Sequence, residues 1–306
     1  MRAWWPSLAA LALFAAVPFV SQVWGGSYLE SLAARAMILA IAAVSLDLLI
    51  GRGGMVSLGH AAFLGIGAYA AGIAITEGWE SLPAILAVAV AASALFGVVT
   101  GAVALRTEGV AFIMITLAFG QMAFFTFAAL SEYGGDDGTT LWSGAQALGV
   151  AVEGHVLYAT ILGTLVLAWA FVTRLSGSRF GRVLAAAKQN EERVETLGFG
   201  VFGIRLTAYV IAGVIAGVAG VLATLEAEFF SPAISAWQRS GDLIVIVVLG
   251  GMATRGGALI GAIALVALEE GLSSLTYDWR LIFGPLLILA ALGARRGLAG
   301  ALEGRA

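Results

Sequence analysis

Two ionisable side chains, Asp47 and His60, stand in an apolar stretch that could enter a membrane, SLDLLIGRGGMVSLGHAAFLGIGAYAAG over residues 45–72. Ionisable groups at membrane depth are costly, and they usually face the interior of a helix bundle or a cavity. The two side chains could contact a solute on its path, or they could form structural hydrogen bonds between helices. We favour the structural role, because histidine is often a satisfied packing group.

No other pattern in the sequence indicates catalysis or metal binding. The chain has no cysteine, and its only histidines are His60 and His155, which argues against thiolate chemistry, disulfides and a histidine metal site. The spacings of serine hydrolases and zinc proteases are missing. Nothing matches the phosphate-binding pattern GxxxxGK[ST], so we expect neither an enzyme nor a self-contained ATPase, and no cofactor in this chain.

A polar segment over residues 174–205 holds six of the 16 basic residues, and a segment of this kind cannot cross a bilayer. Four apolar residues recur at helical spacing and should share one face: Val183, Ala187, Val194 and Leu197. Gly198 then follows as a helix stop. A helix lying on a membrane surface would present bulky apolar residues, whereas this face is mainly Ala and Val. We therefore expect a helix near residues 181–197 that docks on a partner.

Composition predicts the elements that position these residues. The chain has 306 residues, of which 60% are hydrophobic and 11% charged, and its mean hydropathy is +0.98. Soluble domains carry roughly 25% charged residues. Several apolar runs reach the roughly 20 residues that span hydrocarbon. We predict an all-α polytopic integral membrane protein with one transmembrane domain over residues 1–306. About ten membrane segments are expected, at 7–24, 29–50, 55–76, 82–105, 109–130, 155–173, 206–225, 242–251, 258–275 and 280–295.

Glycine pairs interrupt two of these segments, at Gly53-Gly54 and at Gly250-Gly251. Each pair could mark a broken or re-entrant helix, or a simple turn. Gly-Gly-Met occurs at both places, and three further positions match in spacing: Gly54 with Gly251, Gly59 with Gly256, and Ala61 with Ala258. The similarity suggests an internal repeat of the kind found in transporters. Chance similarity in a Gly- and Ala-rich chain is the other explanation.

The distribution of charge predicts orientation, because cytoplasmic loops are enriched in Lys and Arg. With residues 174–205 placed in the cytoplasm, all but three of the 16 basic residues fall on that side, the exceptions being Arg35, Arg239 and Arg280. Acidic residues gather in the outer loops instead, at Glu77, Glu80, Glu132, Asp136, Asp137, Glu153, Glu226 and Glu228. Both termini should then be cytoplasmic.

Taken together, these features resemble the M-type permease subunit of branched-chain amino acid ABC importers over most of residues 29–300. The resemblance is carried by the segments at 46–72, 105–122, 133–138, 178–223, 231–237, 247–262 and 295–300. Their combination is highly specific, although no single segment would suffice.

The resemblance implies that residues of the polar segment couple the chain to an ATPase. These are Ser178, Arg179, Phe180, Gly181, Arg182, Asn190, Glu191, Glu195, Leu197 and Gly198. The family often has apolar or small residues where this chain has Glu192-Arg193-Val194, which bears on the detailed ATPase contacts. The resemblance also implies that Ser57, Gly59, His60 and Phe63 line the translocation path or pack near it, and the depth of Asp47 adds that residue to the same set.

By resemblance, the chain is a permease subunit of an ATP-driven importer in the bacterial inner membrane. Its expected partners are a second, H-type permease, two ABC ATPase subunits that use ATP, and a periplasmic solute-binding protein. No nucleic acid is expected. The cargo is expected to be branched-chain amino acids, with urea, short amides or aromatic acids as alternatives. A secondary transporter driven by ions is a further alternative, for which Asp47, Glu269 and Glu270 are the candidate buried charges.

Overall fold

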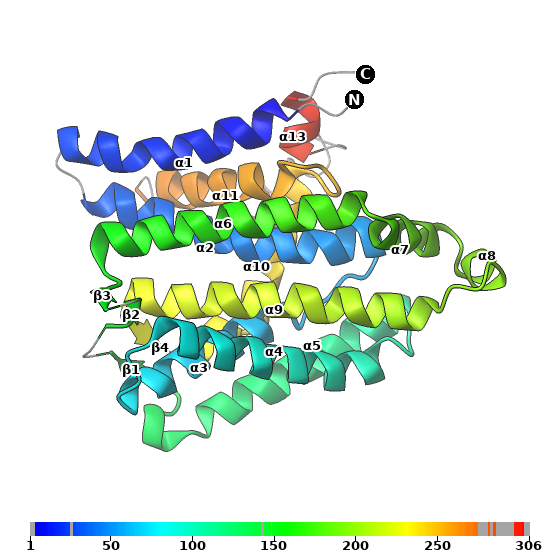
Figure 1. The fold of residues 1–306 in the computed structure, drawn as a ribbon, viewed down its shortest axis with the longest axis horizontal. Coiled ribbons are helices and arrows are strands. Elements are labelled where there is room, and N and C mark those ends of the chain that lie inside the picture. Colours follow the sequence, from blue (N-terminus) through cyan, green and yellow to red (C-terminus); the bar gives the residue numbers. More distant parts are fainter. Residues whose placement is uncertain are drawn as a thin grey trace.

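The computed structural model describes residues 4–24, 27–141, 144–147, 149–274, 281, 284–285 and 297–302. Its long helices lie side by side along the longest axis of the molecule (Figure 1). The first half of the chain forms α1 (Trp5–Trp24), α2 (Ser27–Asp47), α3 (His60–Thr76), α4 (Leu82–Ala104) and α5 (Gly109–Ala128). The second half forms α6 (Gly154–Gly177), α9 (Val201–Ala227), α10 (Trp237–Gly250), α11 (Gly257–Ser273) and α13 (Gly297–Leu302).

Five helical stretches of the described chain are long and apolar enough to cross a membrane. They are Tyr28–Gly53, Leu82–Ala104, Gly109–Ala128, Gly154–Gly177 and Val201–Ala227. Two shorter apolar helices cover Trp5–Ser21 and His60–Thr76. Each membrane segment predicted between residues 7 and 275 overlaps a described helix, whereas the last one, at 280–295, lies mostly outside the described residues. The number ten therefore stays a prediction.

Helix α9 lies at the centre of the bundle and packs against α2, α3 and α4. Its contact with α3 depends on glycine, because a Cβ atom at Gly67 or at Gly220 would overlap a main-chain carbonyl of the facing helix. Such close approach maximises van der Waals contact, which drives helix association in a membrane. Gly217 lies in this contact, so the GxxxG spacing of α9 serves packing.

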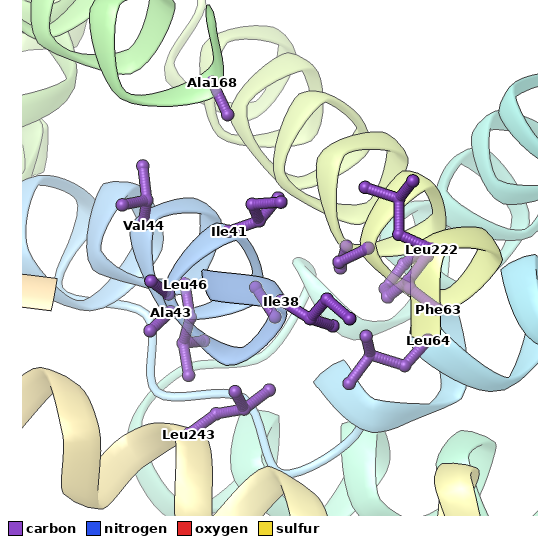
Figure 2. Packing of buried hydrophobic residues seen from close by; sticks show 14 of the residues in the cluster. Ile38, Ile41, Ala43, Val44, Leu46, Phe63, Leu64, Ala168, Leu222 and Leu243 are labelled. Atoms are coloured by element: carbon purple, nitrogen blue, oxygen red, sulfur yellow. The ribbon is translucent and has the colours of Figure 1, made fainter. Parts of the chain in front are cut away.

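Buried aliphatic side chains fill the space around α2. Figure 2 shows Ile38 and Ile41 of α2 beside Leu222 of α9, while Leu243 of α10 and Ala168 of α6 approach α2 from opposite sides. Ile41 and Leu243 are completely buried and Leu222 is 1% exposed. Helix α2 is thus enclosed on several sides, which fixes the position of the polar groups at its end.

Both predicted glycine pairs interrupt helices. Helix α2 continues into one turn of π-helix, η1 (Leu48–Gly53), and residues 54–59 are non-helical, so α3 begins only at His60. The predicted segment 55–76 therefore starts too early. Gly54 follows η1 with φ +69°, a conformation that glycine adopts without strain. Helix α10 likewise ends at Gly250, six non-helical residues follow, and α11 begins at Gly257. Both pairs therefore lie at breaks between helices, while the internal repeat stays a prediction.

Short strands and turns cover the end of the bundle opposite α7 and α8 (Figure 1). Strand β1 (Thr139–Thr140) pairs antiparallel with β4 (Phe229–Phe230), and β2 (Gln146–Ala147) pairs with β3 (Val150–Ala151). Two 3₁₀ turns, η2 (Ser131–Tyr133) and η3 (Pro232–Ser235), flank them. The all-α prediction is therefore corrected by two short strand pairs. They form because the backbone groups of these loops require hydrogen-bond partners. Acidic residues gather here as predicted, with Glu77 and Glu80 accepting hydrogen bonds from Tyr133 and Gln146.

Candidate functional site

The polar segment forms two helices, α7 (Arg179–Gln189) and α8 (Glu191–Thr196), which project from one end of the bundle (Figure 1). A continuous helix was expected here, but Asn190 separates the two with φ −159° and ψ 103°. The Asn190 side chain accepts a 2.8 Å hydrogen bond from the backbone N–H of Arg193 and so caps α8. Asparagine is a favoured N-cap because its side chain satisfies an otherwise unpaired N–H of the first turn.

The predicted apolar face is confirmed for three of its four members. Val183, Ala187 and Val194 pack together with Val201, the first residue of α9. Leu197 is the exception, because its side chain is 71% exposed. It follows the last turn of α8, and Gly198 with φ +87° then redirects the chain, so the helical period no longer applies at Leu197.

Two exposed aromatic residues near Leu197 were missed by the sequence reasoning. Phe199 is 46% exposed and Phe202 is 42% exposed, and together with Leu197 they form an apolar tip at the α8–α9 turn. Contiguous exposed apolar patches rimmed by polar residues mark sites of interaction with proteins or membranes. Their position outside the helical repeat hid them from a periodicity analysis.

The predicted Ser-Arg-Phe-Gly-Arg motif forms the corner between α6 and α7. Ser178 caps α7, since its Oγ accepts from the backbone N–H of Gly181 at 3.4 Å and donates to the carbonyl of Leu175 at 2.6 Å. A Cβ atom at Gly181 would lie 2.5 Å from the carbonyl oxygens of both Leu175 and Ser176. Arg182 closes the corner by donating from Nη1 to the carbonyl of Gly177 at 3.0 Å.

The remaining predicted coupling residues divide by exposure. Arg179 and Glu195 are exposed, and Phe180 is half-buried against the main core. Arg179, Arg182 and Arg193 are exposed on the projecting helices, and so are the acidic Glu192 and Glu195.

An ion-pair network connects α8 to the beginning of α5. Arg205 Nη1 lies 2.8 Å from Glu191 Oε2 and 3.1 Å from Glu108 Oε1, and the Arg205 side chain is only 14% exposed. Burial raises the pKa of the Glu191 carboxyl, and its hydrogen bond to Glu108 together with Arg205 lowers the pKa of the Glu108 carboxyl. The network therefore holds the beginning of α8 and of α9 against Glu108, the residue before α5.

Lys188, which the sequence did not single out, anchors α7 to the end of α2. Its Nζ donates to the backbone carbonyls of Ile50 at 3.3 Å and of Gly51 at 3.1 Å, both within η1. Leu184, one turn earlier, is completely buried. The segment that projects from the bundle is thus also bonded to the broken helix inside it.

The residues predicted for the path or the core lie apart from the projecting pair, in the bundle. Asp47 is half-buried at the end of α2, and its Oδ1 accepts a 2.8 Å hydrogen bond from the backbone N–H of Ala253. It borders a cavity that is also lined by Arg52, Trp169 and Arg255. Asp47 therefore has a structural partner on the α10–α11 turn.

The other four members of this set are buried. His60 Nε2 lies 2.8 Å from Ser45 Oγ, which links α3 to α2. Phe63 packs edge-on against Phe96 and Tyr209. Ser57 is fully buried, and Gly59, the N-cap of α3, contacts the main chain of α5. His60 thus has one hydrogen-bond partner on α2, while its Nδ1 is buried without one among the described residues, and the choice between a packing role and a place on the path stays a prediction.

Apolar helices of membrane-spanning length, with a polar helical pair projecting from one end, define a multi-pass helical membrane protein. The chain belongs to the family described as the permease component of the branched-chain amino acid transport system, whose model matches residues 28–292.

Named relatives support this assignment. The chain is 28% identical to the high-affinity branched-chain amino acid transport system permease protein LivM of Salmonella typhimurium and 29% identical to LivM of Escherichia coli K12. Each match covers 95% of this chain and 73% of the relative. The ribose import permease protein RbsC of Escherichia coli K12 is 30% identical over 83% of this chain and 81% of its own length. No solved structure matches the chain.

Proposed function

We propose that this chain is the membrane-spanning subunit of an ATP-driven importer and that its cargo is branched-chain amino acids. The family match over residues 28–292 carries the proposal. The two LivM relatives, each matched over 95% of this chain, favour an amino acid as the cargo. Transport then proceeds by alternating access, in which the partners stabilise one of two conformations more than the other.

The projecting pair α7–α8 is the surface on which we place the ATPase. It exposes arginines together with the apolar side chains of the tip, which a partner could bury. Specific interfaces combine an apolar core with a polar rim. The sequence has no GxxxxGK[ST] pattern, so ATP binding is assigned to that partner. Two ATPase subunits, a second permease of the H type and a periplasmic solute-binding protein complete the proposed importer.

The orientation of the chain in the proposal follows from its charges. Lys188, Arg182 and Arg205 lie at the end that carries α7 and α8, and the acidic loops lie at the other end. Lys- and Arg-rich loops remain in the cytoplasm. We therefore place α7 and α8 in the cytoplasm of a bacterium and the short strands on the periplasmic side of the inner membrane.

Two alternatives differ in cargo and in energy source. The 30% identity to a ribose import permease makes a sugar a second candidate cargo, beside urea, short amides and aromatic acids. An ion-driven transporter would need free buried charges, yet Glu269 pairs with Arg35 at 2.8 Å and Asp47 accepts from Ala253. These contacts favour the ATP-driven importer.

Uptake by reconstituted vesicles tests the proposal. The chain is combined with an ABC ATPase, a second permease and a solute-binding protein, and ATP is supplied on the side of the membrane that carries the ATPase. We expect uptake of radiolabelled leucine that stops when the ATPase carries a hydrolysis-blocking substitution. Uptake that persists with the blocked ATPase and collapses with an ionophore would overturn the importer. Uptake of ribose without leucine would retain the importer and replace the cargo.

A further inference from the structure

We propose that Lys188 is a positioning residue that makes the broken end of α2 follow the movement of α7. The inference rests on the proposed function, because it assigns a route by which a docked ATPase moves the membrane helices. Its basis is the contact of Lys188 Nζ with the carbonyls of Ile50 and Gly51, 138 and 137 positions away in the sequence.

The chemistry of this contact is that of a cation at a helix end. The last carbonyls of a helix have no partner within it, and they carry partial negative charge. At the end of η1 the backbone N–H of Gly54 donates to the carbonyl of Ile50 at 3.3 Å, and the backbone N–H of Met55 donates to the carbonyl of Leu49 at 3.0 Å. Lys188 adds its ammonium group to the same turn. An ammonium group can donate three hydrogen bonds, so it can hold two adjacent carbonyls at once.

The shapes of the two segments also match. The aliphatic stem of Lys188 crosses Gly54, where a Cβ atom would lie 2.9 Å from Lys188 Cγ. Gly54 has φ +69°, so both the backbone and the lysine stem require glycine there. Leu184 packs one helical turn earlier, and a Cβ atom at Gly53 would lie 3.7 Å from its Cδ1. Helix α7 therefore meets the broken helix at two successive turns.

The broken helix in turn contacts the α10–α11 turn. Asp47, which immediately precedes η1, accepts the N–H of Ala253, and a Cβ atom at Gly51 would lie 2.7 Å from the same nitrogen. Movement of α7 thus reaches both glycine-interrupted segments through Lys188 and η1. Arg182, on the same helix, instead donates to the carbonyl of Gly177 within the α6–α7 corner.

Lys188 is exposed overall, so its bonds can break and re-form without unfolding the bundle. A replacement should therefore leave the fold intact and change the coupling between ATP hydrolysis and transport.

The test compares Lys188→Met with Lys188→Arg in the complete reconstituted importer. Methionine keeps the apolar stem and removes the donors, whereas arginine keeps the donors. We expect Lys188→Met to hydrolyse ATP and bind the ATPase normally while solute transported per ATP falls about fivefold or more. Lys188→Arg should recover most of the loss. Arg174→Met, which removes an exposed basic residue at the end of α6, is the matched control and should not change the ratio.

Three outcomes overturn the role of Lys188: an unchanged transport-to-ATP ratio in Lys188→Met, an equal loss in Lys188→Arg, or a parallel loss of ATPase binding. A failure of the proposed function is distinguished by the unsubstituted chain, which would then show no ATP-dependent uptake. The chain has no cysteine, so spin labels can be placed at Ala186 and Met252 in detergent without partners. Lys188→Met should broaden their distance distribution, and an unchanged distribution also contradicts the proposal.

Discussion

The carboxylate of Asp47 accepts a 2.8 Å hydrogen bond from the backbone N–H of Ala253, although 206 positions separate the two residues. The bond joins the two segments in which Gly-Gly-Met interrupts a helix. Ala253 has φ +58°, which is unfavourable for a residue with a side chain. The hydrogen bond from Asp47 helps to hold this strained turn against the end of α2.

Removing this acceptor should destabilise the bundle. We expect Asp47→Leu to lower the free energy of unfolding by about 1–3 kcal/mol, because the half-buried N–H of Ala253 loses its partner. Asp47→Asn retains an acceptor oxygen and should lose less. Thermal unfolding in detergent measures both variants. Ala253→Gly relieves the backbone strain and should recover part of the loss in Asp47→Leu, while equal stability of the Leu and Asn variants would contradict the role of the bond.

A methyl group at Gly181 should disturb the corner from which α7 projects. Its Cβ atom would lie 2.5 Å from two main-chain carbonyl oxygens, and main chain moves less easily than side chains. We expect Gly181→Ala to insert into the membrane normally but to reduce ATPase association and uptake. Gly177→Ala is the control, because a Cβ atom there meets nothing within 4 Å. Equal uptake by the two variants would show that the corner geometry is unimportant.

The exposed side chains of the apolar tip should contribute to binding of the ATPase. Replacing Leu197 and Phe199 together by alanine should weaken ATPase binding by about tenfold or more, as loss of interface anchors does. Phe171→Ala serves as the control, since Phe171 is 49% exposed on α6, away from the tip. Binding is measured on the purified chain in detergent. If the control weakens binding as much as the double variant, the tip is not the docking surface.

The Arg205 network should give stability a defined pH dependence. At pH 7, Arg205→Met leaves the Glu108 and Glu191 carboxylates facing each other and should cost about 1 kcal/mol. The Glu191 hydrogen bond and then Arg205 lower the pKa of Glu108, so the stability that this carboxylate contributes is fully present above the ordinary glutamate pKa and is lost as the pH falls through the lowered pKa. The deficit of Arg205→Met should therefore persist down to the ordinary glutamate value of 4.5 and shrink as the pH falls below it.

Arg205→Lys keeps the positive charge and is the comparison for this series. It should retain most of the stability at pH 7 and the pH dependence of the unsubstituted chain. A deficit in Arg205→Met that stays constant as the pH falls well below 4.5 would indicate lost packing rather than lost charge pairing.

The positions of glycines in the sequence were sufficient to predict several helix ends near the site. Gly54 and Gly251 were expected to interrupt helices, and both follow the last residue of a helix in the structure. Gly198 was expected to stop a helix and has φ +87°. Each of these depends on backbone conformation over a few residues, which residue type strongly influences.

The errors came where one helix was assumed to continue. Leu197 was placed on the apolar face with Val194, but the break at Asn190 and the turn at Gly198 leave it exposed. A periodicity of 3.6 residues describes one uninterrupted helix and says nothing after a change of direction. The same limit explains why Phe199 was missed.

The sequence by itself determined that this is a helical membrane protein of the permease family with a polar segment outside the bilayer, because hydrophobic run length, composition and motif spacing are properties of the chain alone. The tertiary structure decided which distant groups meet. Lys188 reaches Ile50, Asp47 reaches Ala253, and Arg205 reaches Glu108 only after the helices have packed. Such contacts depend on how helices approach one another in space, which residue spacing along a single helix does not specify.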